Sequence, residues 1–194
     1  MHRVEKNWHR REAPSFGHLL VEAGMIVFSI LLALGIESWR EHRAHEKLAE
    51  TAMRNIRVEI ARNRDALRHV LPEHKALVTY LQWISDRLAR GEDVQPSTTY
   101  RPANLLSAAW DTAGSTQALV YVDFAKVQRL SRLYSGHGWV QRLEGNWLNL
   151  TSNPSFRTRE GMPRYAENLV RTMSDLVGIE EELAAGCDRV LETL

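Results

Sequence analysis

The sequence has little cysteine, little proline and almost no net charge. Its 194 residues include one cysteine, Cys187, and six prolines, and the formal net charge is +1. A single thiol cannot close a disulfide within the chain, so no framework of bridges supports the fold. A net charge this close to zero gives no reason to expect nucleic acid as a partner. Apolar residues make up 44% and charged residues 25%, which is typical of a globular protein.

Motifs of the common nucleotide-binding and hydrolytic enzymes are also absent. The chain has no Walker loop, no G-x-G-x-x-G, no G-x-S-x-G and no H-E-x-x-H. His42 and His45 lie three residues apart on an expected helix, near Glu41 and Glu46, and this spacing can place two imidazoles on one metal ion. Because no third ligand is visible, we interpret them as a solvated helix face, with a metal site as the alternative. We predict no catalytic residue and no cofactor.

The chain does contain one long apolar run. Residues 19–36 hold a single charged residue, Glu22, and eleven Leu, Ile, Val or Phe residues. With residues 16–18 the run reaches the length of about 20 residues that spans a membrane as a helix. Each large aliphatic residue favours insertion by about 0.3–0.6 kcal/mol, whereas a central charge costs about 2.5–3.5 kcal/mol. We therefore predict a transmembrane helix over residues 16–38; a buried core helix and a cleaved signal peptide are the alternatives.

The basic residues on either side of this run predict an orientation. Four Lys or Arg residues precede the run, and three follow it up to residue 53. The positive-inside rule then places residues 1–15 in the cytoplasm as a tail. Residues 39–194 are expected to form a helical bundle domain in the periplasm. The predicted location is the bacterial inner membrane, with a single pass.

One face of the run carries small and polar residues. Glu22, Ser29 and Ala33 share this face, and Ser29 and Ala33 form a small-xxx-small pair that lets two helices approach closely. Glu22 has three interpretations: an edge carboxylate in headgroup water, a contact between subunits, or a group in proton chemistry. The expected partners are the lipid bilayer and either a second copy of the chain or another membrane-complex protein. Three residues are expected at the membrane–water interface: Glu37, Trp39 and Arg40.

The stretch from Glu22 to Glu41 contains LLALGIESW and ends in Glu37-Ser38-Trp39-Arg40-Glu41. It resembles a family of uncharacterised bacterial single-pass membrane proteins. That family's segment begins with an acid at this offset and ends in a pattern like G-I-L-I-A-L-x-I-N-x-W-x-E. Here Ser29 stands at its first Gly and Glu37 at its Asn. A second signature of this family is similar to three later stretches: AAWDTA at 108–113, Ala118-Leu119, and L-x-x-L-Y at 130–134. The resemblance, over residues 16 to about 135, implies a helical membrane protein without an established activity.

Beyond the run, apolar residues recur at helical spacing. A seam from Ala49 to Val70 needs a partner in this chain or in a second copy. Its polar member, Asn63, either fixes the register of a coiled coil or lies in water at the end of a bundle. Pro72 is expected to break the helix, and Gly91 to end the next one. A further helix is expected at 104–113, capped by Asn104 or just before it. Another is expected from 124 onward after an Asp123 cap, and residues 136–138 should kink or fray it. The last helix is expected to start near Pro163.

The predicted fold class is therefore all-α: an N-terminal transmembrane helix that continues into a long helix, followed by an antiparallel helical bundle. Residues 117–122 are expected to form a turn or helix start rather than a lone strand. Cys187 lies on the apolar stripe of the last helix and is expected to be a small buried side chain.

Trp110 and Asp111, inside the second signature, are the candidates for a functional surface. The alternative is that Trp110 fills the core and Asp111 caps a helix. We favour a membrane-anchored interaction, scaffold or accessory protein that self-associates. A metal-dependent enzyme at the paired histidines is one alternative, and a periplasmic ligand-binding sensor is another. The sensor's pocket would be lined by four aromatic residues: Trp83, Trp110, Tyr134 and Trp139.

Overall fold

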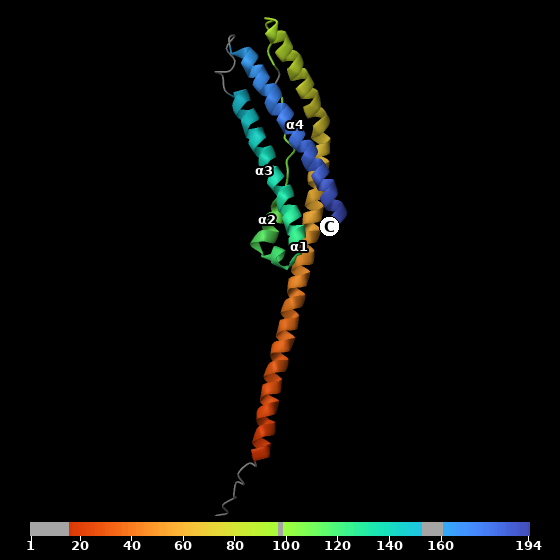
Figure 1. Ribbon diagram of the computed structural model, residues 1–194, viewed down its shortest axis with the longest axis vertical. Helices are drawn as coiled ribbons and strands as arrows, with labels where there is room; N and C mark the ends of the chain where they lie inside the picture. The colour runs from red at the N-terminus through yellow and green to blue at the C-terminus, as the bar shows by residue number, and fades with distance from the viewer. Residues whose placement is uncertain (1–15, 97–98, 153–160) are drawn as a thin grey trace, which may run out of the picture. The chain divides into compact units, whose positions relative to one another are not determined.

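The computed structural model describes residues 16–96, 99–152 and 161–194 (Figure 1). The predicted cytoplasmic tail, residues 1–15, lies outside these ranges. Every regular element within them is a helix, which confirms the all-α prediction. The chain divides into two compact units, Met1–Glu46 and Lys47–Leu194. The elements are α1 (Phe16–Ala89), α2 (Ala108–Ser115), the 3-10 helix η1 (Ala118–Tyr121), α3 (Phe124–Ser152) and α4 (Met162–Thr193).

The first unit contains the apolar part of α1. An 18-residue window of this helix has a mean hydropathy of 2.0, and by length and composition it could cross a membrane. None of that window is buried within the protein. Its large side chains between Leu20 and Ile36 are 52–66% exposed. This segment is therefore not a core helix of this chain.

In the second unit, α1 packs against α4, and α4 also packs against α3 (Figure 1). The predicted seam is buried, with Ile56, Ile60 and Leu67 at most 1% exposed. The predicted stripe on α4 joins the same apolar core and includes Cys187, which is fully buried as expected. The partner of the seam therefore lies within this chain.

The predicted break at Pro72 is wrong, because α1 continues through it to Ala89. Proline inside a helix leaves the carbonyl four residues earlier unbonded and costs about 3 kcal/mol. That carbonyl belongs to Arg68, and both Arg68 and Pro72 lie on the exposed side of the helix. Val70 and His74, on either side of the proline, are buried. Tertiary packing on both sides keeps the helix continuous.

The predicted kink at residues 136–138 is also wrong, since α3 is unbroken. A Cβ atom on Gly136 would lie 2.8 Å from Cδ1 of Leu183, and one on Gly186 would lie 3.2 Å from Cδ1 of Leu133. Each helix thus sets a leucine against a glycine of the other, which allows α3 and α4 to pack closely. This contact outweighs the cost of glycine in a helix, about 1 kcal/mol.

Three predicted helix ends are confirmed. Gly91 has φ +77°, and the N–H groups of Gly91 and Glu92 donate to carbonyls of the last turn of α1, at 2.9 and 3.1 Å. This pair of bonds is a Schellman motif. The Asp123 Oδ1 atom accepts the N–H of Lys126 at 3.0 Å and so caps α3. Pro163 lies in the first turn of α4.

Candidate functional site

Residues 99–107 form a segment without regular secondary structure, and buried polar side chains of α1 hold it. Asn63, 1% exposed, makes two bonds to the backbone of Leu106: its Nδ2 donates to the carbonyl at 2.7 Å, and its Oδ1 accepts the N–H at 2.8 Å. His74, 2% exposed, donates from Nε2 to the carbonyl of Arg101 at 2.9 Å. Both interpretations of Asn63 are wrong, because its role is to bind this segment.

Glu59 on α1 holds the start of α2. Glu59 is next to Ile60 of the apolar seam in the sequence, and its side chain is only 6% exposed. Its Oε2 accepts the N–H of Ala109 at 2.7 Å, and its Oε1 accepts the N–H of Trp110 at 3.3 Å and the hydroxyl of Tyr134 at 2.7 Å. The free amides at a helix N-terminus favour a negative charge. Glu59 therefore caps α2 from another helix.

The helix expected over 104–113 begins later than predicted, because Glu59 and not a neighbouring residue caps it. α2 spans Ala108–Ser115, and Ser107 before it makes no side-chain capping bond. Asn104, the expected cap, has φ +49° instead. A cap supplied by α1 leaves no local signal in this stretch. Residues 118–121 form η1, which confirms a helical turn rather than a strand.

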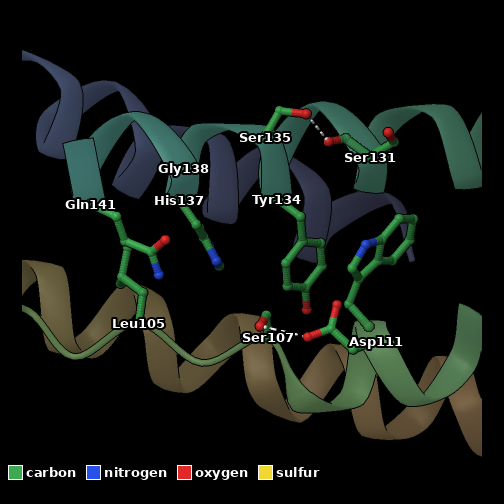
Figure 2. Close-up of a pocket in the computed structure, with 10 residues that line it drawn as sticks. Leu105, Ser107, Asp111, Ser131, Tyr134, Ser135, His137, Gly138 and Gln141 are labelled. Atoms are coloured by element: carbon green, nitrogen blue, oxygen red, sulfur yellow. Dashed lines mark hydrogen bonds between the residues drawn. The ribbon is translucent and has the colours of Figure 1, made fainter.

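Trp110 and Asp111 line a pocket of about 330 Å³ between α3 and the chain that leads into α2 (Figure 2). The Trp110 ring, half-buried, stacks on Tyr134 with centroids 5.0 Å apart and an interplanar angle of 13°. The Asp111 carboxylate is exposed and accepts the hydroxyl of Ser107 at 2.8 Å. Trp110 therefore forms a wall of the pocket, and Asp111 binds a side chain rather than a backbone amide.

His137 forms another part of the wall, and sequence spacing did not identify it. Its ring extends from α3 between Gln141 and Tyr134 (Figure 2), and it meets Tyr134 edge-on at 4.9 Å. The residue is 5% exposed, and neither ring nitrogen has a hydrogen-bond partner among the described residues. Burial lowers the pKa of His137, opposed only in part by the charge of Glu59. The neutral ring therefore has one N–H donor and one acceptor, both unused.

The electrostatic character of this pocket is negative. Asp111 is the one charged side chain among its lining residues in the described chain. Glu59 adds a second carboxylate behind Tyr134, whose hydroxyl it binds. Burial, together with this bond and the charge of Glu59, raises the pKa of Tyr134, so the hydroxyl stays protonated. The arrangement suits a positive or neutral ligand better than an anion.

The residues predicted on one face of the apolar helix all lie in the first unit. Glu22, Ser29 and Ala33 are exposed. The hydroxyl of Ser29 donates to the carbonyl of Met25 at 2.8 Å, one turn earlier in the same helix. This bond satisfies the hydroxyl without a second helix.

The predicted interfacial residues pair along the same helix. Arg40 lies 3.7 Å from Glu37, with both side chains 71% exposed. An exposed pair of this kind adds little stability. The guanidinium of Arg43 lies 5.3 Å from the centre of the Trp39 ring. These contacts keep a charged, aromatic band next to the apolar run.

The two histidines proposed as metal ligands each contact an acid one turn away. His42 Nε2 lies 3.3 Å from Glu46, and His45 Nε2 lies 3.6 Å from Glu41. Within the described ranges, no group of three or more His, Cys, Asp or Glu side chains could hold a metal ion. The structure thus brings no third ligand to this pair.

The structure brings together two of the four aromatic residues expected in one pocket. Trp110 and Tyr134 stack there, whereas Trp83 and Trp139 are 49% and 55% exposed and do not line it. Each of these two tryptophans has an arginine of its own helix over its ring, at 4.7 and 3.7 Å. The pocket therefore contains two of the four predicted aromatic residues, and several polar side chains line the rest of it.

Comparison of the chain with protein-family models, with curated proteins and with solved structures gives no match. The resemblance of residues 16 to about 135 to a family of bacterial membrane proteins therefore stays a prediction.

Proposed function

We propose that this protein is a membrane-anchored interaction, scaffold or accessory protein. Its apolar helix would cross the bacterial inner membrane once, with the N-terminus in the cytoplasm and the bundle in the periplasm. The supporting observation is that the large side chains from Leu20 to Ile36 are 52–66% exposed. Each such side chain gains about 1.5–3 kcal/mol when it leaves water. A segment of this kind is stable in lipid and unfavourable in water.

Self-association would use the membrane helix rather than the bundle. The seam from Ala49 to Val70 is already filled by this chain's own core. The remaining candidate surface is the face with Glu22, Ser29 and Ala33, where small residues permit close contact of two helices. The hydroxyl of Ser29 is bonded within its helix, so close packing rather than hydrogen bonding would hold the copies together.

Fractionation of cells that produce the full chain tests the anchor. We expect the protein to sediment with membranes, to resist extraction at alkaline pH and to dissolve only in detergent. Recovery of the intact chain in the supernatant without detergent would refute the anchor.

Crosslinking in native membranes tests self-association. We expect discrete oligomers for the wild-type chain and their loss in Ala33→Ile, because a bulky side chain separates the helices. Gly35→Ile is the matched control, since it introduces the same side chain on the other side of the helix and should leave the oligomers intact. A strictly monomeric wild-type protein would contradict the proposal.

A second candidate function, ligand sensing by the bundle, is supported by the unpaired imidazole of His137. A buried polar group without a partner costs about 1–3 kcal/mol. A leucine at this position would avoid that cost, so a histidine here is more readily explained by a ligand that hydrogen-bonds to it.

Thermal unfolding tests this second function. Without ligand, His137→Leu should be more stable than wild type, by about 1–3 kcal/mol. If His137→Leu instead destabilised the protein, the imidazole would have a structural role and the sensing function would lose its support.

A further inference from the structure

We propose that the pocket formed by Trp110, Asp111, Tyr134 and His137 binds a small organic cation, either an amine or a quaternary ammonium compound. This inference rests on the second candidate function above and specifies its ligand class. Three features of the pocket point to this chemistry: its charge, its aromatic surface and its hydrogen-bonding groups.

Among the described residues, the charge of the pocket comes from carboxylates. Asp111 lines it, and Glu59 lies directly behind Tyr134, at 2.7 Å from the hydroxyl. No lysine or arginine is among its lining residues in the part of the chain that the structure describes. Glu59 is committed to the amides of α2 and to Tyr134, whereas Asp111 accepts one hydrogen bond among the described residues, from Ser107. Asp111 therefore keeps free acceptor capacity for a bound cation.

The aromatic surface is the second feature. Trp39, Trp83 and Trp139 each have an arginine side chain over the ring, at 3.7–5.3 Å from the ring centre. No such pair involves Trp110 within the described ranges; it stacks on Tyr134 instead. Aromatic rings attract cations through their negative faces, and pockets for quaternary ammonium groups use this property. Trp110 therefore offers an aromatic surface over which no described Lys or Arg side chain lies.

The hydrogen-bonding groups of the pocket are rich in acceptors. His137 is neutral and has one free ring acceptor. The hydroxyl of Ser135 donates to the carbonyl of Ser131 at 2.8 Å, so its oxygen is left to accept. Together with Asp111, these atoms match the N–H groups of an amine. An anion would meet a carboxylate here and no compensating positive charge.

Isothermal titration of the full chain in an uncharged detergent tests the inference. The probes are choline, its uncharged isostere 3,3-dimethylbutan-1-ol, ethanolamine and acetate. We expect choline or ethanolamine to bind with a Kd in the millimolar range or below, and choline to bind about tenfold more tightly than the isosteric alcohol. Acetate should not bind.

Two matched variants locate the site. Asp111→Asn removes the charge with little change in shape and should weaken binding of the cation about tenfold. Asp175→Asn makes the same change at an exposed position on α4 outside the pocket and should have no effect. Far-UV circular dichroism shows whether both variants remain folded. Equal affinity of choline in Asp111→Asn and wild type would overturn the inference.

The other outcomes separate the ligand class from the sensing function. If the alcohol or acetate bound in this pocket and both cations did not, the pocket would bind ligand but the inferred class would be wrong. If no probe bound at concentrations up to about 50 mM, both the inference and the sensing function would be refuted. Reconstitution into bilayers with and without phosphatidylethanolamine distinguishes the two sources of an ammonium group. Weaker choline affinity with this lipid indicates a headgroup ligand, and unchanged affinity indicates a free amine.

Discussion

Replacement of Glu59 by alanine should strongly destabilise the second unit. The carboxylate accepts three hydrogen bonds, from the N–H of Ala109, the N–H of Trp110 and the hydroxyl of Tyr134, at 2.7, 3.3 and 2.7 Å. A hydrogen bond to a charged group contributes about 1.5–3 kcal/mol, so the two short bonds alone account for about 3–6 kcal/mol. Removal of a buried carboxylate offsets part of this, and we expect a net loss of about 3 kcal/mol or more.

Urea unfolding of the full chain in an uncharged detergent, followed by circular dichroism, measures this loss. Thermal unfolding gives a second measure of the same loss, since for a unit of this size the midpoint should fall by about 2–4 °C per kcal/mol. Glu50→Ala is the control, because Glu50 is exposed on the same helix and should change stability by less than about 0.5 kcal/mol. A Glu59→Ala protein as stable as Glu50→Ala would refute the capping role of Glu59.

Three further predictions concern buried groups of the bundle. Burial lowers the pKa of His74, but the bond to Glu180 at 2.8 Å, that carboxylate's charge and the Arg101 carbonyl raise it above 6.5 overall. The stability that protonated His74 contributes should therefore be complete below pH 6.5 and should be lost as pH rises through this raised pKa. Urea unfolding at several pH values measures this change. The absence of such a fall, or an equal fall in His74→Phe, would contradict the prediction. Gly136→Ala should destabilise the bundle by up to about 2 kcal/mol, because the added Cβ would overpack against Leu183. Gly145→Ala should instead stabilise it by about 0.5–1 kcal/mol, because a Cβ there meets nothing within 4 Å. Effects of the same sign would contradict the close contact between Gly136 and Leu183. Burial raises the pKa of Cys187 to about 11, so the thiol is protonated at pH 8. Ellman's reagent at pH 8 should therefore react with it only after unfolding, and rapid reaction of the native protein would refute this.

The helical framework could be predicted because its signals are local and periodic. The seam from Ala49 to Val70 and the stripe on α4 follow the spacing of one helix face, and both are buried. The cap at Asp123 and the terminator at Gly91 depend only on neighbouring residues, and both are present. The rules for Pro72 and Gly136 failed because tertiary packing outweighs the local cost at each position.

The polar contacts that hold residues 99–110 could not be predicted from local sequence. Asn63, His74 and Glu59 bind backbone atoms that lie 27 to 51 residues farther along the chain. A charged residue beside an apolar seam has the same spacing whether it faces water or a buried amide. No sequence rule for a single helix distinguishes these two environments.

The candidate pocket was predicted only in part. Trp110 and Asp111 were identified through the resemblance of residues 108–113 to a second signature, and they lie together at the pocket. His137 was not predicted as a pocket residue from the sequence. A usable signal was nevertheless present, because Leu130, Tyr134 and His137 repeat at the spacing of the buried face of α3.

Cysteine accessibility in spheroplasts tests the membrane anchor most directly. Single cysteines at Phe28 and at Glu41, each in a Cys187→Ser background, are treated with a charged maleimide that cannot cross lipid. We expect the cysteine at position 41 to react at once and the one at position 28 to react only after detergent dissolves the bilayer. Rapid reaction at position 28 in intact spheroplasts, at the rate of position 41, would show that water surrounds the apolar helix and would contradict the anchor.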